Sequence, residues 1–274
     1  MKNQPLPVLF IFTALDCEAR PIVKFFDLKK DDSQGCFSIY RNEKIVLTVT
    51  GVGKVAMAGA VAYTMAVFPG YQVPLLINVG IAGHKTQALG TLSMAMKIID
   101  GDTGRRFYPQ LLGSHWPETS ELKTTSLPST QYSSDCLYDM EASAFYETAV
   151  RFSSSELIHC FKVVSDNENS SIEKIQPKLV SEWIASQMNE IERILQQLEK
   201  LRESIVPIDL NSYNEMIDKW HFTVSGKIKL KALLQRWKVL TNRAWQHSNE
   251  EKELTGKEVL KKLEGEINHL EVLL

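Results

Sequence analysis

Three acidic residues lie where the chain leaves or enters predicted secondary structure, and they are the side chains best placed to do chemistry. Glu18 follows the apolar run 7–14, Asp166 follows the apolar run 157–164, and Glu141 opens a helix. Carboxyl groups in such positions can serve as general acids or bases. Each acid alone also has a structural interpretation, because a carboxylate at a helix N-terminus stabilises the helix dipole by about 0.3–1 kcal/mol.

The elements that must position these acids alternate between strands and helices. Apolar, β-type runs predict strands over 7–14, 37–42, 44–50, 73–79, 92–99 and 157–164. Helices are predicted over 18–26, 54–68 and 140–152, whereas 101–136 is rich in Gly, Ser, Thr and Pro and is predicted to be irregular. This order predicts an α/β fold with a central mixed β-sheet flanked by helices, whose ligands gather at the carboxyl ends of the strands.

The chain changes character near residue 178. Apolar residues keep a helical spacing for about seven turns, at roughly 1.5 Å per residue, before Pro207 breaks the helix. Two further helices are predicted over 227–245 and 257–274. We therefore expect a first domain over 1–203 and a C-terminal helical extension over 204–274. The apolar stripes of the extension suggest that it mediates oligomerisation or docks a partner protein.

A glycine-rich element, 50–56, follows a strand and opens a helix. Its Gly51-x-Gly53-x-x-Ala56 pattern is a loose dinucleotide-binding fingerprint, but no acid ends the next strand, which reads Asn78-Val79-Gly80-Ile81. It is not a phosphate-binding P-loop either, since Val55 stands where Ser or Thr should follow Lys54. A nicotinamide-dependent oxidoreductase is accordingly disfavoured.

Bulk properties exclude several other classes. The net charge of −2 gives no general attraction to nucleic acid or to an anionic membrane. The basic, Trp-containing stretch 227–245 invites a nucleic-acid interpretation, but acidic residues at 250–253 dilute its charge. The four cysteines show no CxxC spacing, and the N-terminal apolar stretch is too short for a membrane span. We expect a cytoplasmic protein with reduced thiols, no metal and no redox cofactor.

Five motifs, read in order, resemble one enzyme superfamily. They are ALDCEA (14–19), TGVGKVAMAGA (50–60), INVGIAGHK (77–85) followed by LGTL (89–92), YDMEASAF (138–145) and VVSDNEN (163–169). This series is similar to the nucleoside phosphorylase/nucleosidase superfamily, most closely to the branch that hydrolyses methylthioadenosine and S-adenosylhomocysteine. The resemblance covers about residues 7–200, and it implies a small-molecule nucleoside substrate and a homo-oligomer.

The resemblance implies a role for each acid. Asp166 matches the general acid that protonates the purine, Glu18 the acid that activates water, and Glu141 the acid that binds the ribose hydroxyls. These roles suit an oxocarbenium-like transition state. The substrate-binding positions implied by the motifs are Ile81, Ala82, Gly83, Met140, Glu141 and Ser165.

Water is favoured over phosphate as the nucleophile. Asn78 stands where phosphorylases carry an arginine, and Ile81 replaces a hydroxyl-bearing residue, so neither side chain can hold an anion as arginine would. The prediction is an N-ribosyl hydrolase acting on a purine nucleoside or thionucleoside. The alternatives are a noncatalytic nucleoside-binding or scaffold protein and a phosphorolytic nucleoside phosphorylase.

The chain departs from the superfamily pattern in ways that leave the substrate open. Lys162 stands where an arginine is usual, Asn169 where an acid is common, and the stretch between Gly90 and Asp139 is short. That stretch normally supplies an aromatic residue that stacks on the purine, and Tyr132 and Phe107 are the candidates.

Two further sets of residues are weaker candidates for ligand binding. His84 could face the ligand, although a loop histidine is more often structural. Arg105 and Arg106 could grip an anion, although a solvated or salt-bridged pair is the more ordinary arrangement.

Overall fold

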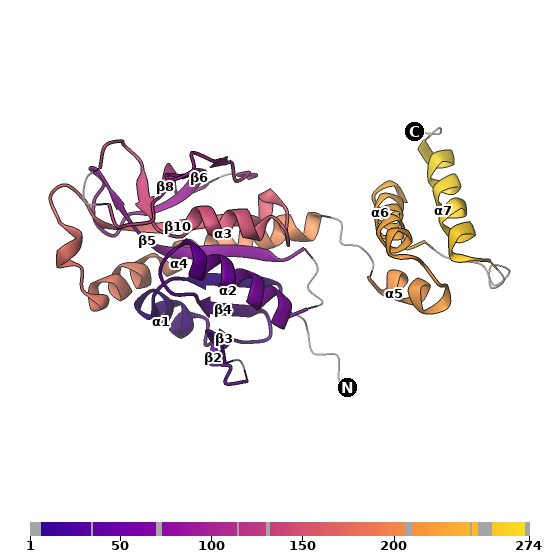
Figure 1. Cartoon of the computed structure of the whole chain (residues 1–274), viewed down its shortest axis with the longest axis horizontal. Helices are drawn as coiled ribbons and strands as arrows, with labels where there is room; N and C mark the ends of the chain where they lie inside the picture. Colours follow the sequence, from indigo (N-terminus) through magenta and orange to yellow (C-terminus); the bar gives the residue numbers. More distant parts are fainter. Residues whose placement is uncertain are drawn as a thin grey trace. The chain divides into compact units, whose positions relative to one another are not determined.

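A computed structural model describes residues 7–33, 35–69, 73–113, 115–129, 132–205, 210–241, 243–245 and 254–271. The chain divides into two compact units, Met1–Arg202 and Glu203–Leu274. Figure 1 follows the path of the chain through both units. Each is described by itself below.

The first unit is built on a single mixed sheet. Its strands are β1 Leu9–Thr13, β2 Lys29–Lys30, β3 Ser38–Arg41, β4 Ile45–Val49, β5 Leu75–His84, β6 Leu92–Asp100, β7 Arg106–Phe107, β8 Glu118–Thr124, β9 Leu137–Asp139 and β10 Ile158–Asp166. They run in the order β10-β6-β8-β9-β5-β1-β4-β3-β2, with β7 paired to β6. The predicted central mixed sheet flanked by helices is confirmed.

Strand β5 is the branching point of this sheet. One edge pairs in parallel with β10, so that β5, β10, β6, β8 and β9 close into a ring. The other edge pairs with β1 over Leu75–Asn78 and with β9 over Gly83–His84. Strands β1 and β9 therefore diverge along β5, and the edge between Asn78 and Gly83 faces a fork in the sheet.

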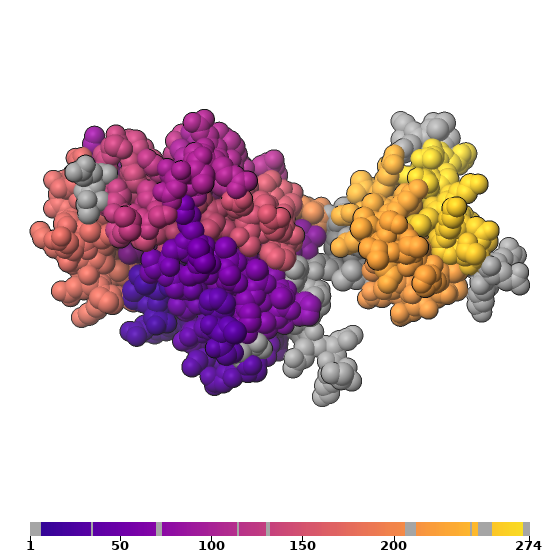
Figure 2. Space-filling view, in the orientation of Figure 1, coloured from indigo at the N-terminus to yellow at the C-terminus, as the bar shows by residue number. Residues whose placement is uncertain are grey.

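Four helices belong mainly to this unit: α1 Asp16–Phe25, α2 Lys54–Val67, α3 Ala142–Ala149 and α4 Pro177–Ser204. Helices α2 and α3 pack against each other and against alternate residues of β1, with the rings of Phe12 and Phe145 5.8 Å apart. Helix α4 is tied to the rest of the unit by Ser181 Oγ, which donates to Cys17 O at 2.6 Å, and by Gln187 Nε2, which donates to Gly90 O at 2.8 Å. On the face of the first unit shown in Figure 2, the indigo N-terminal elements lie in the lower half and the magenta elements in the upper half.

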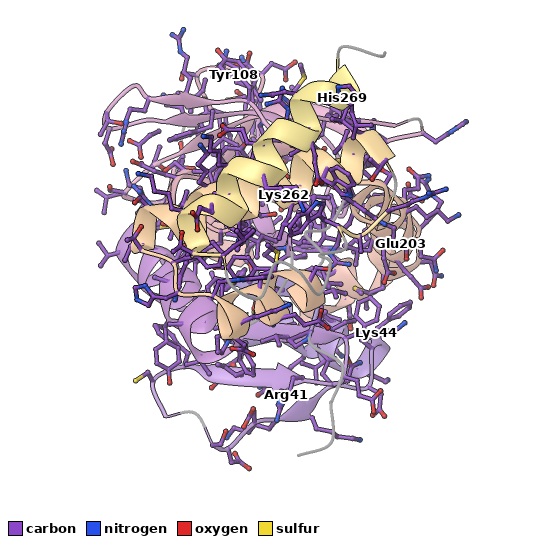
Figure 3. The ribbon with its side chains drawn as sticks, turned by 90° about the vertical axis from the view of Figure 1, so that its right-hand side faces the viewer. Arg41, Lys44, Tyr108, Glu203, Lys262 and His269 are labelled. Carbon is purple, nitrogen blue, oxygen red and sulfur yellow. The ribbon has the colours of Figure 1, made fainter. Side chains whose placement is uncertain are left out.

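The second unit contains α5 Leu210–Lys219, α6 Val224–Thr241 and α7 Gly256–Glu271 around a core of its own. On α7, Val259, Leu263 and Ile267 are buried, whereas Lys262 and His269 are exposed (Figure 3). This spacing is that of an amphipathic helix with one core-facing stripe.

One prediction of secondary structure was wrong, and one helix was not predicted. The stretch 101–136 is not wholly irregular, because β8 adds seven residues, Glu118–Thr124, to the sheet. Its sequence, ETSELKT, buries only Leu122 and Thr124, so it lacks the apolar run that marks a central strand. Helix α5 was not predicted at all, because its apolar positions are few and it follows the break at Pro207. Within the described residues, no helix has both the length and the hydropathy required to cross a membrane.

Candidate active site

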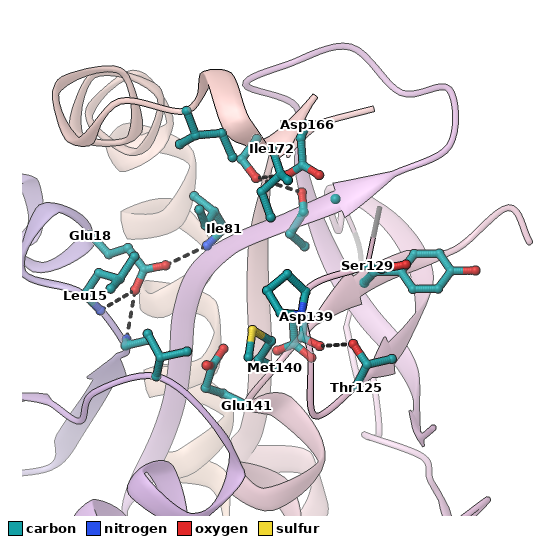
Figure 4. A pocket seen from close by; sticks show the side chains of 18 of the residues that line it. Leu15, Glu18, Ile81, Thr125, Ser129, Asp139, Met140, Glu141, Asp166 and Ile172 are labelled. Carbon is teal, nitrogen blue, oxygen red and sulfur yellow. Dashed lines mark hydrogen bonds between the residues drawn. The ribbon is translucent and has the colours of Figure 1, made fainter. Parts of the chain in front are cut away.

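A cavity of about 260 Å³ opens at the fork between β1 and β9. All of the residues predicted for the site line it: Glu18, Ile81, Ala82, Gly83, Met140, Glu141, Ser165 and Asp166. Figure 4 shows Glu18, Glu141 and Asp166 reaching it from α1, from the start of α3 and from the end of β10. Three segments of the chain, the outermost two more than a hundred residues apart, thus meet at one cavity. Ligand sites in such folds form at the ends of strands in this way.

Glu18 is held entirely by backbone amides. Its Oε2 accepts hydrogen bonds from the amides of Ala14 at 2.8 Å and Leu15 at 2.9 Å, and its Oε1 accepts one from Ile81 at 2.9 Å. The side chain is buried, and burial raises its pKa even though the charge of Lys162 and the three amides act in the opposite direction. A carboxylate with a raised pKa is a stronger base than a free one, which suits a group that activates water.

A buried ion pair lies beside Glu18. Lys162 Nζ is 2.8 Å from Asp139 Oδ2, and neither side chain is exposed by more than 1%. Asp139 Oδ1 accepts a hydrogen bond from Thr124 Oγ1 at 2.7 Å, and its Oδ2 accepts one from the Ala142 amide at 2.9 Å. Burial alone would lower the pKa of Lys162, but the charges of Asp139 and Glu141 raise it above its ordinary value. Lys162 is therefore ionised.

Gly80 makes room for this arrangement. A β-carbon at Gly80 would lie 2.9 Å from Glu18 Oε1 and 3.4 Å from Lys162 Nζ. Lys162 is also the register partner of Gly80 across β5 and β10. The ammonium group therefore reaches toward Glu18 over a residue with no side chain.

Glu141 is held by the glycine-rich element. Its Oε1 accepts a hydrogen bond from the Gly53 amide at 2.7 Å, at the N-terminus of α2. The G-x-G pattern thus binds a carboxylate of the same chain, as helix N-termini favour. Burial, with the neighbouring charge of Asp139, raises the pKa of Glu141 to about 7.

Asp166 ends β10 beside a register shift that falls between Val164 and Asp166. Its Oδ1 accepts a hydrogen bond from Ser165 Oγ at 2.5 Å, and its Oδ2 accepts one from the Tyr132 hydroxyl. The Tyr132 ring packs on Tyr138 with ring centroids 5.3 Å apart. Of the two aromatic candidates, Tyr132 therefore lines the cavity.

Phe107 does not line the cavity, so its prediction as a residue that stacks on the base is corrected. Its ring packs 5.6 Å from that of Tyr146 and lies against the hydrophobic core of the unit. Its strand, β7, pairs with β6 and not with the strands that bound the fork.

Two of the weaker candidates, His84 and Arg105, have structural partners, and so does Asn78. His84 Nδ1 accepts hydrogen bonds from the amides of Thr86 and Gln87, both at 3.1 Å, and does not line the cavity. Arg105 pairs with Glu147. Asn78 Nδ2 donates to Phe12 O at 3.1 Å inside the sheet.

Sequence reasoning missed the Lys162–Asp139 pair as part of the site. A lysine within the apolar run LIHCFKVV was the available signal, because a buried cation requires an anionic partner. No cluster of three or more His, Cys, Asp or Glu that could hold a metal ion occurs among the residues whose placement is described.

Comparison with solved structures identifies the fold. A 5′-methylthioadenosine/S-adenosylhomocysteine nucleosidase from Neisseria meningitidis, in complex with methylthio-immucillin-A, is 19% identical, with a TM-score of 0.51 over 66% of this chain and 100% of its own. A futalosine hydrolase mutant from Helicobacter pylori is 13% identical, with a TM-score of 0.55 over 70% of this chain and 100% of its own. A 5′-methylthioadenosine nucleosidase from Arabidopsis thaliana, in apo form, is 15% identical, with a TM-score of 0.54 over 71% and 96%.

These similarities establish the class of fold, and the sequence motifs predicted it. The chain has the nucleoside phosphorylase/nucleosidase fold, extended by C-terminal helices. No protein-family model and no curated protein sequence matches the chain.

The raised pKa of Glu141 makes stability depend on pH. Between its ordinary value of 4.5 and about 7, the folded protein holds a proton that the unfolded chain has released, so stability falls as pH rises through this window. We expect Glu141→Gln to raise the free energy of unfolding at pH 8 by about 3 kcal/mol relative to the wild type, and to have little effect near pH 4. Urea unfolding at both pH values measures this, with the exposed Glu43→Gln as control. An equal effect at the two pH values would contradict the assignment.

Removing Lys162 should be far more costly than removing a surface lysine. Lys162→Met leaves Asp139 charged and buried without its partner, and we expect a loss of about 3–5 kcal/mol. The matched control is Lys97→Met, which breaks the partly exposed Lys97–Glu121 pair (2.8 Å) and should cost about 1 kcal/mol or less. Chemical denaturation compares the two, and similar losses would refute the special role of the buried pair.

Proposed function

We propose that the first unit is an N-ribosyl hydrolase that cleaves the glycosidic bond of a purine nucleoside or thionucleoside. The observation that carries the proposal is the meeting of Glu18, Glu141 and Asp166 around one cavity at the fork of the sheet. The similar structures include a 5′-methylthioadenosine/S-adenosylhomocysteine nucleosidase and a futalosine hydrolase, which supports a hydrolytic reaction on a nucleoside.

Each acid has surroundings that fit its proposed part. Glu18, buried and with a raised pKa, takes the proton of the attacking water. Glu141 accepts hydrogen bonds from the ribose hydroxyls and puts negative charge beside the developing oxocarbenium ion. Asp166 gives a proton to the departing base, and Met140, Ile81, Ala82, Gly83 and Ser165 line the space for sugar and base.

The charge of the cavity supports water as the nucleophile. Among the described residues, no lysine, arginine or histidine lines it. A phosphate ion there would face carboxylates without a cationic partner, which is unfavourable in a buried site. Phosphorolysis is therefore the weaker alternative.

Substrate hydrolysis tests the proposal directly. We expect the purified protein to release free base from methylthioadenosine, S-adenosylhomocysteine, adenosine or inosine without added phosphate, as measured by chromatography. Asp166→Asn, which cannot supply the proton, should reduce kcat by about a hundredfold or more while the thermal unfolding profile stays intact. Unchanged turnover in this variant would remove Asp166 from its proposed role.

The remaining outcomes separate the alternatives. Release of base only with phosphate would identify a phosphorylase. Tight nucleoside binding without turnover would identify a noncatalytic binding protein, an alternative favoured by the contact of Tyr132 with Asp166.

We also infer that the helical unit mediates self-association. Helix α6 carries three strongly exposed apolar side chains, Val224, Ile228 and Val239. Their exposure does not stabilise a monomer, whereas contact with a second copy would bury them. Deleting residues after Ser204 should lower the number of chains per particle in light scattering, and Ile228→Glu in the full chain should act in the same direction. An unchanged number of chains in both would refute this inference.

A further inference from the structure

The base-binding end of the cavity contains a side chain of the protein itself. In the register of the sheet, Tyr138 of β9 pairs with Gly83 of β5, and Gly83 pairs with Asp166 of β10. The Tyr132 side chain spans this row, because its ring contacts Tyr138 and its hydroxyl donates to Asp166. It is 92% buried, so it belongs to the wall of the cavity and not to its solvent-facing rim.

Gly83 leaves the space in which this ring lies. A β-carbon at Gly83 would lie 2.7 Å from Tyr132 Cε1 and 2.7 Å from Asp166 Oδ2, so any side chain there would displace both groups. The bare α-carbon lets a flat ring lie close against the strand beside Asp166. A planar base that reaches Asp166 over Gly83 would need the same space.

Both oxygens of Asp166 already accept a hydrogen bond from the protein in this arrangement. Ser165 Oγ donates to Oδ1, and the Tyr132 hydroxyl donates to Oδ2. Burial and the adjacent Asp166 raise the pKa of the Tyr132 phenol, so the hydroxyl keeps its proton and acts as a donor. Each oxygen of Asp166 therefore accepts one hydrogen bond from a protein hydroxyl.

We propose that Tyr132 determines access to Asp166: its phenol occupies the base subsite, and a base binds Asp166 only by displacing it. The proposal rests on the function inferred above. Displacement requires the side chain to change rotamer, and the ligand must then replace the hydrogen bond that Asp166 Oδ2 loses, since a buried acceptor left unpaired is costly. Bases that offer no hydrogen-bonding group at that position are excluded.

Adenine, the simplest purine probe with an amino group, measures this competition. Tyr132→Phe removes the hydroxyl that competes for Asp166 and keeps the ring, whereas Tyr132→Ala also removes the ring over Gly83. We expect the Kd for adenine, measured by calorimetry, to fall about tenfold or more in Tyr132→Phe, because the hydrogen bond from the hydroxyl to Asp166 no longer has to be broken. Tyr40→Phe, on β3 beside the edge strand β2, is the matched control and should leave Kd unchanged.

The outcomes distinguish this inference from the proposed function. An unchanged or higher Kd for adenine in Tyr132→Phe overturns the proposed competition between the phenol and the base. Base release by the wild type would still leave the hydrolase proposal intact. Failure of adenine and of every nucleoside to bind the wild type, Tyr132→Phe and Tyr132→Ala, with unfolding profiles showing all three folded, overturns both.

Discussion

The carboxylate of Glu18 accepts hydrogen bonds from backbone amides that the pairing of the strands leaves without partners. Strand β5 is bordered on one edge first by β1 and then by β9, and between the two its backbone faces a fork. A buried amide without an acceptor is costly, so the Ile81 amide at the fork and the amides where β1 ends all need partners. Glu18 accepts from all three, so the interaction that completes the sheet also puts an acid at the cavity.

The charges around this acid explain why its cation lies behind the cavity. Lys162 offsets the charge of the buried Asp139 and opposes the rise in the pKa of Glu18. Under the proposed function, a positive group beside a developing oxocarbenium ion would oppose its formation. Its position on β10 opposite Gly80 keeps the ammonium in the core of the unit. One cation cannot neutralise three acids, which is why burial raises the pKa of both Glu18 and Glu141.

The sequence reveals the elements of this site more readily than the contacts between them. Apolar runs mark β1, β5 and β10, and the motifs that follow them contain Glu18, Ile81 and Asp166, so residues and strands could be predicted together. Strand β8 is polar and was missed, because its place in the sheet comes from pairing with β6 and not from its own pattern. The fork along β5 is equally hidden, since strand order depends on long-range pairing that periodicity does not record.

The two ends of the cavity are held by different kinds of donor. Glu18 is fixed by backbone amides, which cannot move without breaking the sheet. Asp166 is bound by the hydroxyls of Ser165 and Tyr132, and side-chain donors can rotate away at the cost of a rotamer change. A ligand can therefore exchange hydrogen bonds at Asp166 but not at Glu18. Under the proposed function, preorganisation at Glu18 suits the positioning of a small nucleophile, and exchange at Asp166 suits recognition of a base in competition with Tyr132.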